Sequence, residues 1–461
     1  MRRNRLYIGV ICAVLVLASC GVVKPYQQPQ VATQDLYRDV DTNDTSSIAN
    51  MKWDELFTDP KLQGLIRKAI DSNPDLRIAF TRVQQAEALY LQSRAAFLPS
   101  LDANVGVTES KLSEVQGFGI RNNATQYQLG LSASWEADIW GRLASNRRAN
   151  LAALLQTNAA ARAVQTSIVA TVANLYYTLL ALDQQLLVTQ QTVRNWDTTV
   201  QTMRALKDAA RVTEAAVVQS EAQRYAAEVT LPDIRQRLRE TENALSILLG
   251  EPPTSVDRGV LTEQQVVETL TTGIPAQLLS NRPDVQVAEL GFRNAFELTN
   301  VARTNFYPAL RITGNAGLSS LALGNLFDIG SLAANIGAGL TQPIFNQRAN
   351  RTRLEIAQAQ QQEALINFRN SLLVAGSEVS DALSLHQTSS EKVAIRRLQI
   401  NSLQLSVEYS QELLQHGFAN YTEVINARQS LLQAELGNIN DRLERLQAVV
   451  ELYRALGGGW K

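Results

Sequence analysis

The sequence is poor in the side chains that enzymes and metal proteins use. Its 461 residues include two cysteines and two histidines. Cys12 and Cys20 both lie near the N-terminus, so the rest of the chain has no thiol for a disulfide, a metal or a nucleophile. A G-x-S-x-G motif and a phosphate-binding glycine loop are also absent. We therefore predict that the protein is not an enzyme and binds no metal.

A long hydrophobic run is missing as well. The apolar run over residues 6–17 is too short to cross a bilayer as a helix, and three arginines precede it. Residues 17–21 (LASCG) follow with the pattern of a bacterial lipobox. We predict a signal peptide over residues 1–19 and a lipid on Cys20 as the only cofactor. An ordinary signal peptide with an incidental Cys20 is the alternative.

The sequence has no excess of charge of one sign. The net charge is −1, and it becomes −4 once the three arginines leave with the signal peptide. This balance is too mild to indicate nucleic acid or an acidic substrate as a partner. Gly21, rather than an aspartate, follows Cys20, which fits sorting of a lipoprotein to the outer membrane.

An internal repeat organises the remaining chain. Residues 74–79 (PDLRIA) match residues 283–288 (PDVQVA) at an offset of 209. Other landmarks recur at offsets of 205 to 209, including Leu248-Leu249-Gly250 and Ala455-Leu456-Gly457. A tandem duplication explains this agreement.

The duplication predicts four parts after the signal peptide. We expect a lipidated extended segment at residues 20–52, a first repeat at 53–250, a linker at 251–282 and a second repeat at 283–461.

Proline is absent from two long stretches, and these are predicted to be helical. None lies between Pro99 and Pro232, and none follows Pro343. Apolar residues recur there at helical spacing. Each repeat is therefore expected to carry a long arm of two antiparallel helices of about 50 residues. Pro232, in the second helix of the first pair, should mark a kink or a break.

Four short segments alternate apolar and polar residues. They form a pair at about residues 100–109 and 126–136, and a second pair at about 309–319 and 334–342. Such segments suit the strands of a transmembrane β-barrel, although a half-buried soluble hairpin shows the same alternation. The duplicated pairs behind an export signal favour membrane strands.

Four strands cannot close a barrel alone, and an open sheet edge in lipid is prohibitively costly. Two chains would give eight strands, whose interior is filled by side chains. Three chains would give a twelve-stranded barrel with an aqueous lumen. The strand count therefore predicts a homotrimer.

Several motifs resemble those of a known family. Residues 53–62 (WDELFTDPKL) and 73–76 (NPDL) resemble the opening signature of TolC-like outer membrane factors. Residues 24–29 (KPYQQP), 282–285 (RPDV) and 456–460 (LGGGW) are similar to the OprM/NodT-type lipoprotein branch. The ordered set spans the chain from about residue 20 to its end.

The resemblance implies an α+β membrane protein with internal duplication. Three chains would form a transmembrane β-barrel, a twelve-helix periplasmic α-barrel and an equatorial α/β belt. The implied function is the outer-membrane exit duct of a tripartite efflux system for drugs or other small toxic molecules. The implied partners are a periplasmic adaptor and an inner-membrane resistance-nodulation-division transporter.

The resemblance also places a periplasmic gate at residues 414–427. Glu423 and Asn426 match positions that are often acidic in the family, and Asn426 is neutral here. In the first repeat, Ala216 stands where an aspartate is frequent, with Glu214 nearby. The tyrosine and arginine that often brace the gate are replaced by Leu414 and Ala419. A solvated carboxylate at a helix tip, without a gating role, is the alternative for Glu423.

Two other functions stay open at this point. A type I secretion duct for proteins would use the same tube. A helical periplasmic adaptor or adhesin would share the long arms, but the duplicated strand pairs count against it.

Overall fold

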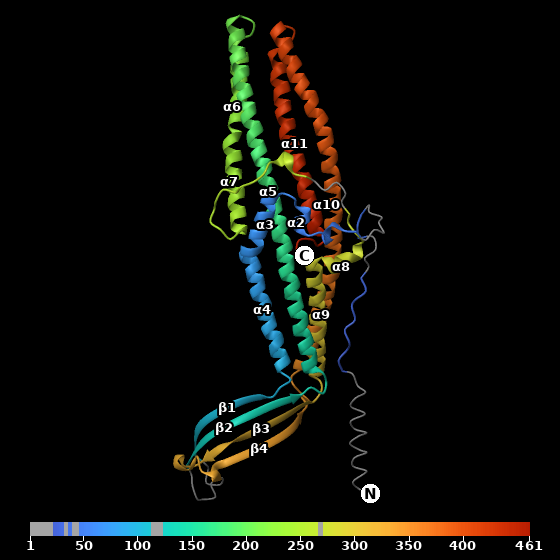
Figure 1. Ribbon diagram of the computed structural model, residues 1–461. Helices are drawn as coiled ribbons and strands as arrows, with labels where there is room; N and C mark the ends of the chain where they lie inside the picture. Colours follow the sequence, from blue (N-terminus) through green and yellow to red (C-terminus); the bar gives the residue numbers. More distant parts are fainter. Residues whose placement is uncertain (1–21, 32–35, 39–45, 112–122, 266–270) are drawn as a thin grey trace. The chain divides into compact units, whose positions relative to one another are not determined.

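The computed structural model describes residues 22–31, 36–38, 46–111, 123–265 and 271–461 (Figure 1). The signal peptide and Cys20 lie outside this part of the chain. The chain divides into two compact units. The strand unit comprises Met1–Gln30, Val83–Thr157 and Ala288–Phe368, and the helical unit comprises Val31–Arg82, Asn158–Val287 and Arg369–Lys461.

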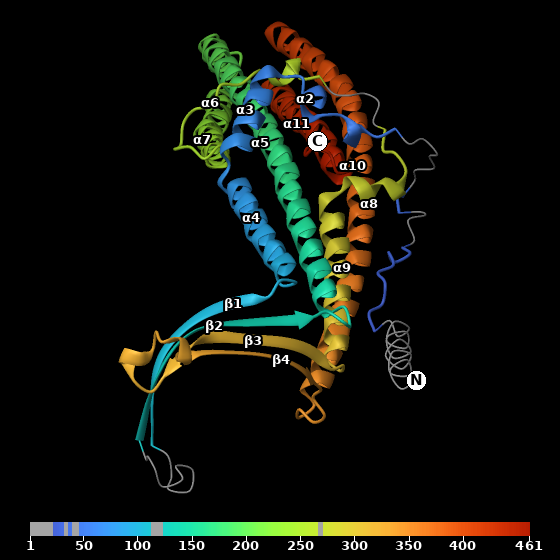
Figure 2. The ribbon, with the colours of Figure 1, turned by 60° about the horizontal axis from the view of Figure 1, so that its bottom comes forward.

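The strand unit carries one antiparallel sheet in the order β1-β2-β3-β4. The strands are β1 (Ser100–Lys111), β2 (Asn123–Ala137), β3 (Ala309–Ser320) and β4 (Leu332–Thr341). Each repeat supplies one neighbouring pair, and β2 and β3 join the two repeats. Figure 2 shows that the strands curve along their length.

The register separates apolar and polar side chains onto opposite faces of the sheet. In one row across the four strands, Val105 lies opposite Leu129, Leu129 opposite Leu318, and Leu318 opposite Leu332. Among the described residues, Val105 is 79% exposed, Leu129 and Leu332 are also exposed, and Leu318 is partly covered. A sheet with one uncovered apolar face and one polar face is what a membrane barrel requires.

Two very long helices begin directly after the strand pairs. They are α5 (Arg142–Asp208, 67 residues) and α10 (Ala349–His416, 68 residues). At 1.5 Å per residue, each is about 100 Å long. None of the helices in the described ranges is both long enough and apolar enough to span a membrane.

The return helices are shorter, so the expected division into equal halves of about 50 residues was wrong. The first arm returns through α6 (Glu214–Glu228) and α7 (Thr230–Leu248), and the second through α11 (Tyr421–Ala455). The lengths differ because the chain turns later than expected, after Asp208 in the first arm and after His416 in the second. Apolar periodicity continues through a turn and does not locate it.

The break expected near Pro232 is confirmed. Helix α6 ends at Glu228, and Pro232 is the third residue of α7. Proline has no N–H to donate to the carbonyl four residues earlier, which is that of Glu228, and its ring crowds that carbonyl. The helix therefore restarts after Val229.

Shorter helices complete the two units. They are α2 (Trp53–Leu56), α3 (Pro60–Ser72), α4 (Pro74–Ala95), α8 (Leu278–Asn281) and α9 (Pro283–Thr304). Short 3-10 helices occur at Ile48–Asn50, Leu261–Glu263, Pro275–Gln277, Leu323–Asn325 and Ile329–Ser331.

The two repeats close in the same way. Gly250 and Gly457 follow the last helices of the two repeats, with φ of 68° and 89°. A glycine in this left-handed region is a common helix stop, because other residues pay a steric cost there.

The side chain before each Pro-Asp pair then caps the closing helix. Asn73 donates through Nδ2 to the carbonyl of Leu248 at 2.8 Å. At the equivalent place in the second repeat, Arg282 donates through Nη1 to the carbonyl of Ala455 at 3.0 Å. The duplication thus extends from sequence landmarks to individual hydrogen bonds.

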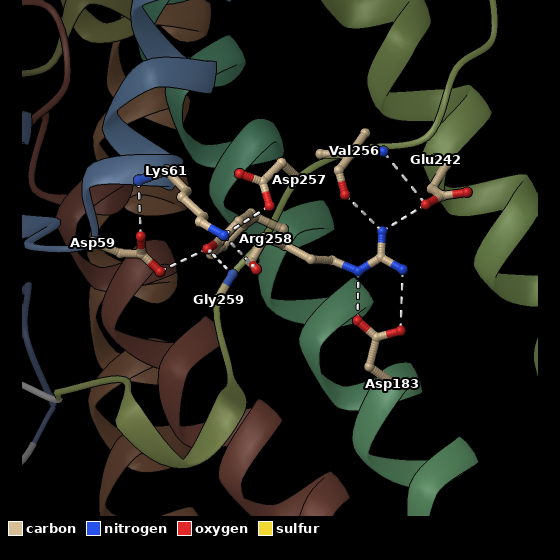
Figure 3. Close-up of polar contacts among 9 residues, drawn as sticks. Asp59, Lys61, Asp183, Glu242, Val256, Asp257, Arg258 and Gly259 are labelled. Atoms are coloured by element: carbon tan, nitrogen blue, oxygen red, sulfur yellow. Dashed lines mark hydrogen bonds and ion pairs between the residues drawn. The ribbon is translucent and has the colours of Figure 1, made fainter.

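The linker after the first repeat is fixed by polar contacts within the helical unit (Figure 3). Arg258 pairs with Asp183 at 2.5 Å and with Glu242 at 2.5 Å. Hydrogen bonds and ion pairs to both acids raise the pKa of Arg258 above its usual value, despite partial burial. Nearby, Lys61 pairs with Asp257 at 2.7 Å.

A tyrosine on α5 extends this anchor. Tyr176 donates to Asp59 Oδ2 at 2.6 Å and accepts from the Gly259 amide at 2.9 Å. Burial and the hydrogen bond to Asp59 raise the pKa of Tyr176 above its usual value, so it remains a donor at physiological pH. These contacts give the linker a structural role.

Candidate gate at the helix turns

Both arms turn in the helical unit at matching positions of the repeat. The first turn lies at residues 209–213 and the second at residues 417–420. Each contains a residue with positive φ, Ala210 at 54° and Gly417 at 81°. These residues are 207 positions apart, the offset at which the closing glycines also recur.

An apolar cluster joins the two turns. It consists of Met203, Ala216, Val217, Leu414 and Val424, which come from α5, α6, α10 and α11. All five side chains are buried, and Ala216 is 0% exposed. Leu414, predicted to replace a brace of the gate, lies in this cluster, so apolar packing contributes to the contact between the arms.

A second apolar cluster lies further along the arms. Trp196 and Val193 of α5 pack with Ala227 of α6 and Ile425 of α11. Trp196 is almost fully buried. The first and second arms are therefore packed against each other at two levels near the turns.

Glu423 takes part in the N-terminal cap of α11. The Asn420 side chain accepts a hydrogen bond from Thr422 N at 3.3 Å, and Glu423 Oε1 accepts one from Asn420 N at 3.5 Å. This reciprocal arrangement is a capping box, and an acidic residue in the first turn is also favoured by the helix dipole. Glu423 thus has a structural role in addition to its predicted role in the gate.

The remaining gate candidates differ in their surroundings. Asn426 is exposed and lies one helical turn after Glu423. Glu214 begins α6 and pairs with Lys207 at 2.6 Å. The side chain of Ala216 is buried, so its contact within the chain is packing. In the described part of the chain, no basic side chain forms an ion pair with Glu423.

Sequence reasoning missed the polar contacts between the turns and along the first arm. Arg211 donates through Nη2 to the Gln415 carbonyl at 3.5 Å, which links the first turn to the second. Arg204 pairs with Glu221 at 2.5 Å between α5 and α6. In neither pair do the two partners lie on the same helix, so no helical spacing in the sequence predicts the contact. Only the packing of the helices brings them together.

Both histidines lie on α10. His416 ends α10 and is exposed. Burial and the nearby charge of Arg445 lower the pKa of His386 below its usual value. Across the described ranges, no three His, Cys, Asp or Glu side chains are grouped to hold a metal ion.

A groove opens beside the second apolar cluster. It has a volume of about 320 Å³ and is lined by α5 and α11, including Leu187, Arg428 and Glu435. Burial lowers the pKa of Arg428 and raises the pKa of Glu435. The structure brings these charged groups to one groove, but it assigns them no ligand.

Comparison with known proteins identifies the kind of molecule. The model of the family described as "Outer membrane efflux protein" matches residues 65–251 and 274–458. The two matched segments start 209 residues apart, in agreement with the duplication.

Two relatives that match over nearly their whole length support this family assignment. The chain is 30% identical to the solvent efflux pump outer membrane protein SrpC of Pseudomonas putida, over 97% of each protein. It is 28% identical to SilC of Salmonella typhimurium, named a probable outer membrane lipoprotein, over 98% of each.

The open state of the Neisseria gonorrhoeae MtrE outer membrane channel superposes with a TM-score of 0.86 at 26% identity. The match covers 96% of this chain and 99% of MtrE. These similarities place the protein in the outer membrane. The chain belongs to the outer membrane efflux protein family.

Proposed function

We propose that three copies of this chain form the outer-membrane exit duct of a tripartite efflux pump for small toxic molecules. The observation that carries the proposal is the four-stranded sheet with one uncovered apolar face. Its edge strands β1 and β4 each have a free side within the described chain. In lipid, both edges need a partner, and further copies of the chain can supply it.

The number three follows from the size of the lumen. Eight strands from two copies would enclose a barrel filled by side chains, whereas twelve strands from three copies leave room for water. The arms of α5, α6, α7, α10 and α11 would form the periplasmic α-barrel. The linker held by Arg258 would form part of the equatorial belt.

The proposed partners are a periplasmic adaptor and an inner-membrane resistance-nodulation-division transporter, with outer-membrane lipid around the barrel. SrpC, a relative along its whole length, is named as part of a solvent efflux pump, which supports small molecules as cargo. A type I secretion duct would share the tube, but that relative favours efflux. A helical adaptor or adhesin would not explain the four-stranded sheet with its uncovered apolar face. The proposal includes no catalytic step and no nucleic acid partner.

Reconstitution of the purified protein in planar bilayers tests the proposal. We expect trimers that survive mild heating in detergent, together with stepwise single-channel currents. Monomers without conductance would contradict it and would favour the adaptor or adhesin.

The lipid anchor is a separate proposal. The name of SilC supports it, and replacing Cys20 with alanine is expected to abolish labelling by radioactive palmitate. Cys12→Ala is the matched control, because Cys12 lies within the predicted signal peptide and its loss should leave labelling unchanged. Labelling that persists in Cys20→Ala would remove the basis for the anchor.

The gate proposal for Glu423 must be separated from its role in the cap. Glu423→Gln can still accept the hydrogen bond of the capping box but has no charge, whereas Glu423→Ala loses both. If contacts of the Glu423 carboxylates with neighbouring copies help hold the turns closed, both variants should raise conductance about two- to fivefold, the range that exposed charge interactions support.

Single-channel recording of both variants is the measurement. An increase in Glu423→Ala alone would assign the residue to the helix cap and not to a charged ring.

A further inference from the structure

The polar face of the sheet carries one row that combines a carboxylate with amides. Asp102 of β1 lies opposite Ser132, Ser132 opposite Asn315, and Asn315 opposite Asn335. Asn315 also donates through Nδ2 to Asn335 Oδ1 at 3.2 Å. Because residues at one level of a ladder share a face, these four side chains point to the same side of the sheet.

Asp102 has no oppositely charged side chain in its own row or in the next row of this face on either side. The other charged side chains of the face in the described strands are Glu136 and Arg311, which lie opposite each other. Arg142 binds Glu136 at 2.7 Å, and Arg311 approaches it to 3.8 Å. Among the described residues, Asp102 has no such ion pair and is exposed.

The adjacent row leaves space beside the carboxylate. Two residues further along the strands, Gly130 lies opposite Gly317, and Asn104 lies opposite Gly130. The missing side chains leave a depression of about 270 Å³, which Asn104, Asn315 and Asn335 also line. The wall near Asp102 is thus built from amides and backbone, which hydrated ions can approach.

We propose that Asp102 gives the lumen of the β-barrel its preference for cations. The inference rests on the proposed trimer, in which three copies of the row would close into one ring. A ring of carboxylates attracts cations and repels anions, and amide oxygens beside it add to the attraction. The effect requires low salt, because the Debye length is about 10 Å at 0.1 M and about 3 Å at 1 M.

This ring would act independently of the helix turns. It lies on the strands, whereas Glu423 lies at the start of α11. Solutes would therefore meet a second charge filter in the barrel, one that favours neutral and cationic cargo over anions.

The reversal potential of single channels across a KCl gradient measures this preference. In Asp102→Asn, the ratio of cation to anion permeability is expected to fall about twofold at about 0.1 M salt and to change little at 1 M. The matched control is Glu109→Gln. Glu109 is an acidic residue of the same strand, but it lies on the apolar face, opposite Thr125. It should leave the ratio unchanged.

A second variant separates a charge effect from a folding defect, because it allows the charge to be changed chemically after folding. Asp102→Cys would have its only free thiol at this position, because Cys20 is proposed to carry lipid and Cys12 to leave with the signal peptide. A thiol reagent that adds a sulfonate should restore the cation preference, and a reagent that adds an ammonium should lower it further.

Each outcome is decisive. An unchanged ratio in Asp102→Asn, or an equal change in Glu109→Gln, would overturn the role of Asp102 while leaving the channel intact. Absence of current steps in the unmodified protein would instead overturn the proposed function, and this inference with it.

Discussion

Replacing Arg282 with methionine is expected to lower the free energy of unfolding by about 2–4 kcal/mol, because the guanidinium joins three partners in the helical unit. Arg282 is 3% exposed. It forms ion pairs with Asp284 at 2.5 Å and with Glu378 at 2.7 Å. It also donates a hydrogen bond to the carbonyl of Ala455, at the end of α11, at 3.0 Å. The loss should be smaller than for a fully buried pair, since both acids remain partly in water.

The apparent melting temperature of the full-length protein in detergent measures this effect. Asn73→Ala is the matched control, because Asn73 occupies the same place in the first repeat and caps Leu248 without any charge. It should cost about 1 kcal/mol, the size of an ordinary cap. Equal losses in the two variants would mean that the ion pairs of Arg282 add nothing.

The same pair predicts a dependence on pH. Burial alone would raise the pKa of Asp284, but the hydrogen bond from Arg282 and its charge outweigh burial and lower it. A lowered pKa in the folded state gives stability that is complete above the unfolded value of about 3.9. The contribution of Asp284 should therefore be constant at neutral pH and lost as the pH falls below that value. In Arg282→Met this part of the acid sensitivity should disappear.

Gly317→Ala is expected to cost about 3 kcal/mol, the upper end for an overpacked site. An added Cβ would lie 2.4 Å from the Leu129 carbonyl oxygen and 2.5 Å from Gly130 Cα. Both are backbone atoms of the neighbouring strand, so no side chain can move aside to relieve the contact. Strands β2 and β3 would have to separate where the two repeats meet.

The yield of heat-resistant oligomer in membranes measures this loss, and we expect it to fall strongly. Gly339→Ala on β4 is the matched control, since an added Cβ there meets no atom within 4 Å. It should behave like the unmodified protein. A normal yield from Gly317→Ala would show that the sheet can relax at the junction of the repeats.

Local rules account for the features that were predictable from the sequence. Period-two alternation located the two strand pairs, because each face of the sheet has a different environment. The chemistry of Pro232 located the break between α6 and α7. Ala210 and Gly417 are related by the repeat offset of 207, and both have positive φ.

Features that depend on packing between distant segments were not predictable. Arg282 and Glu378 are 96 residues apart, and no motif connects them. Ala216 is matched to a position that is often acidic, yet the cluster with Met203 and Leu414 buries it. The row containing Asp102 requires the register between β2 and β3, which come from different repeats.

Closure of the barrel between copies is the central claim, and cysteine cross-linking tests it most directly. Neighbouring strands lie about 4.7–4.9 Å apart, within reach of a disulfide. Val105→Cys on β1 would be combined with single cysteines placed in turn along residues 333–338 of β4. At one register, oxidation should give dimers and trimers on a denaturing gel, with no larger species. No cross-link at any position, or a ladder that continues beyond three, would contradict a barrel closed by three chains.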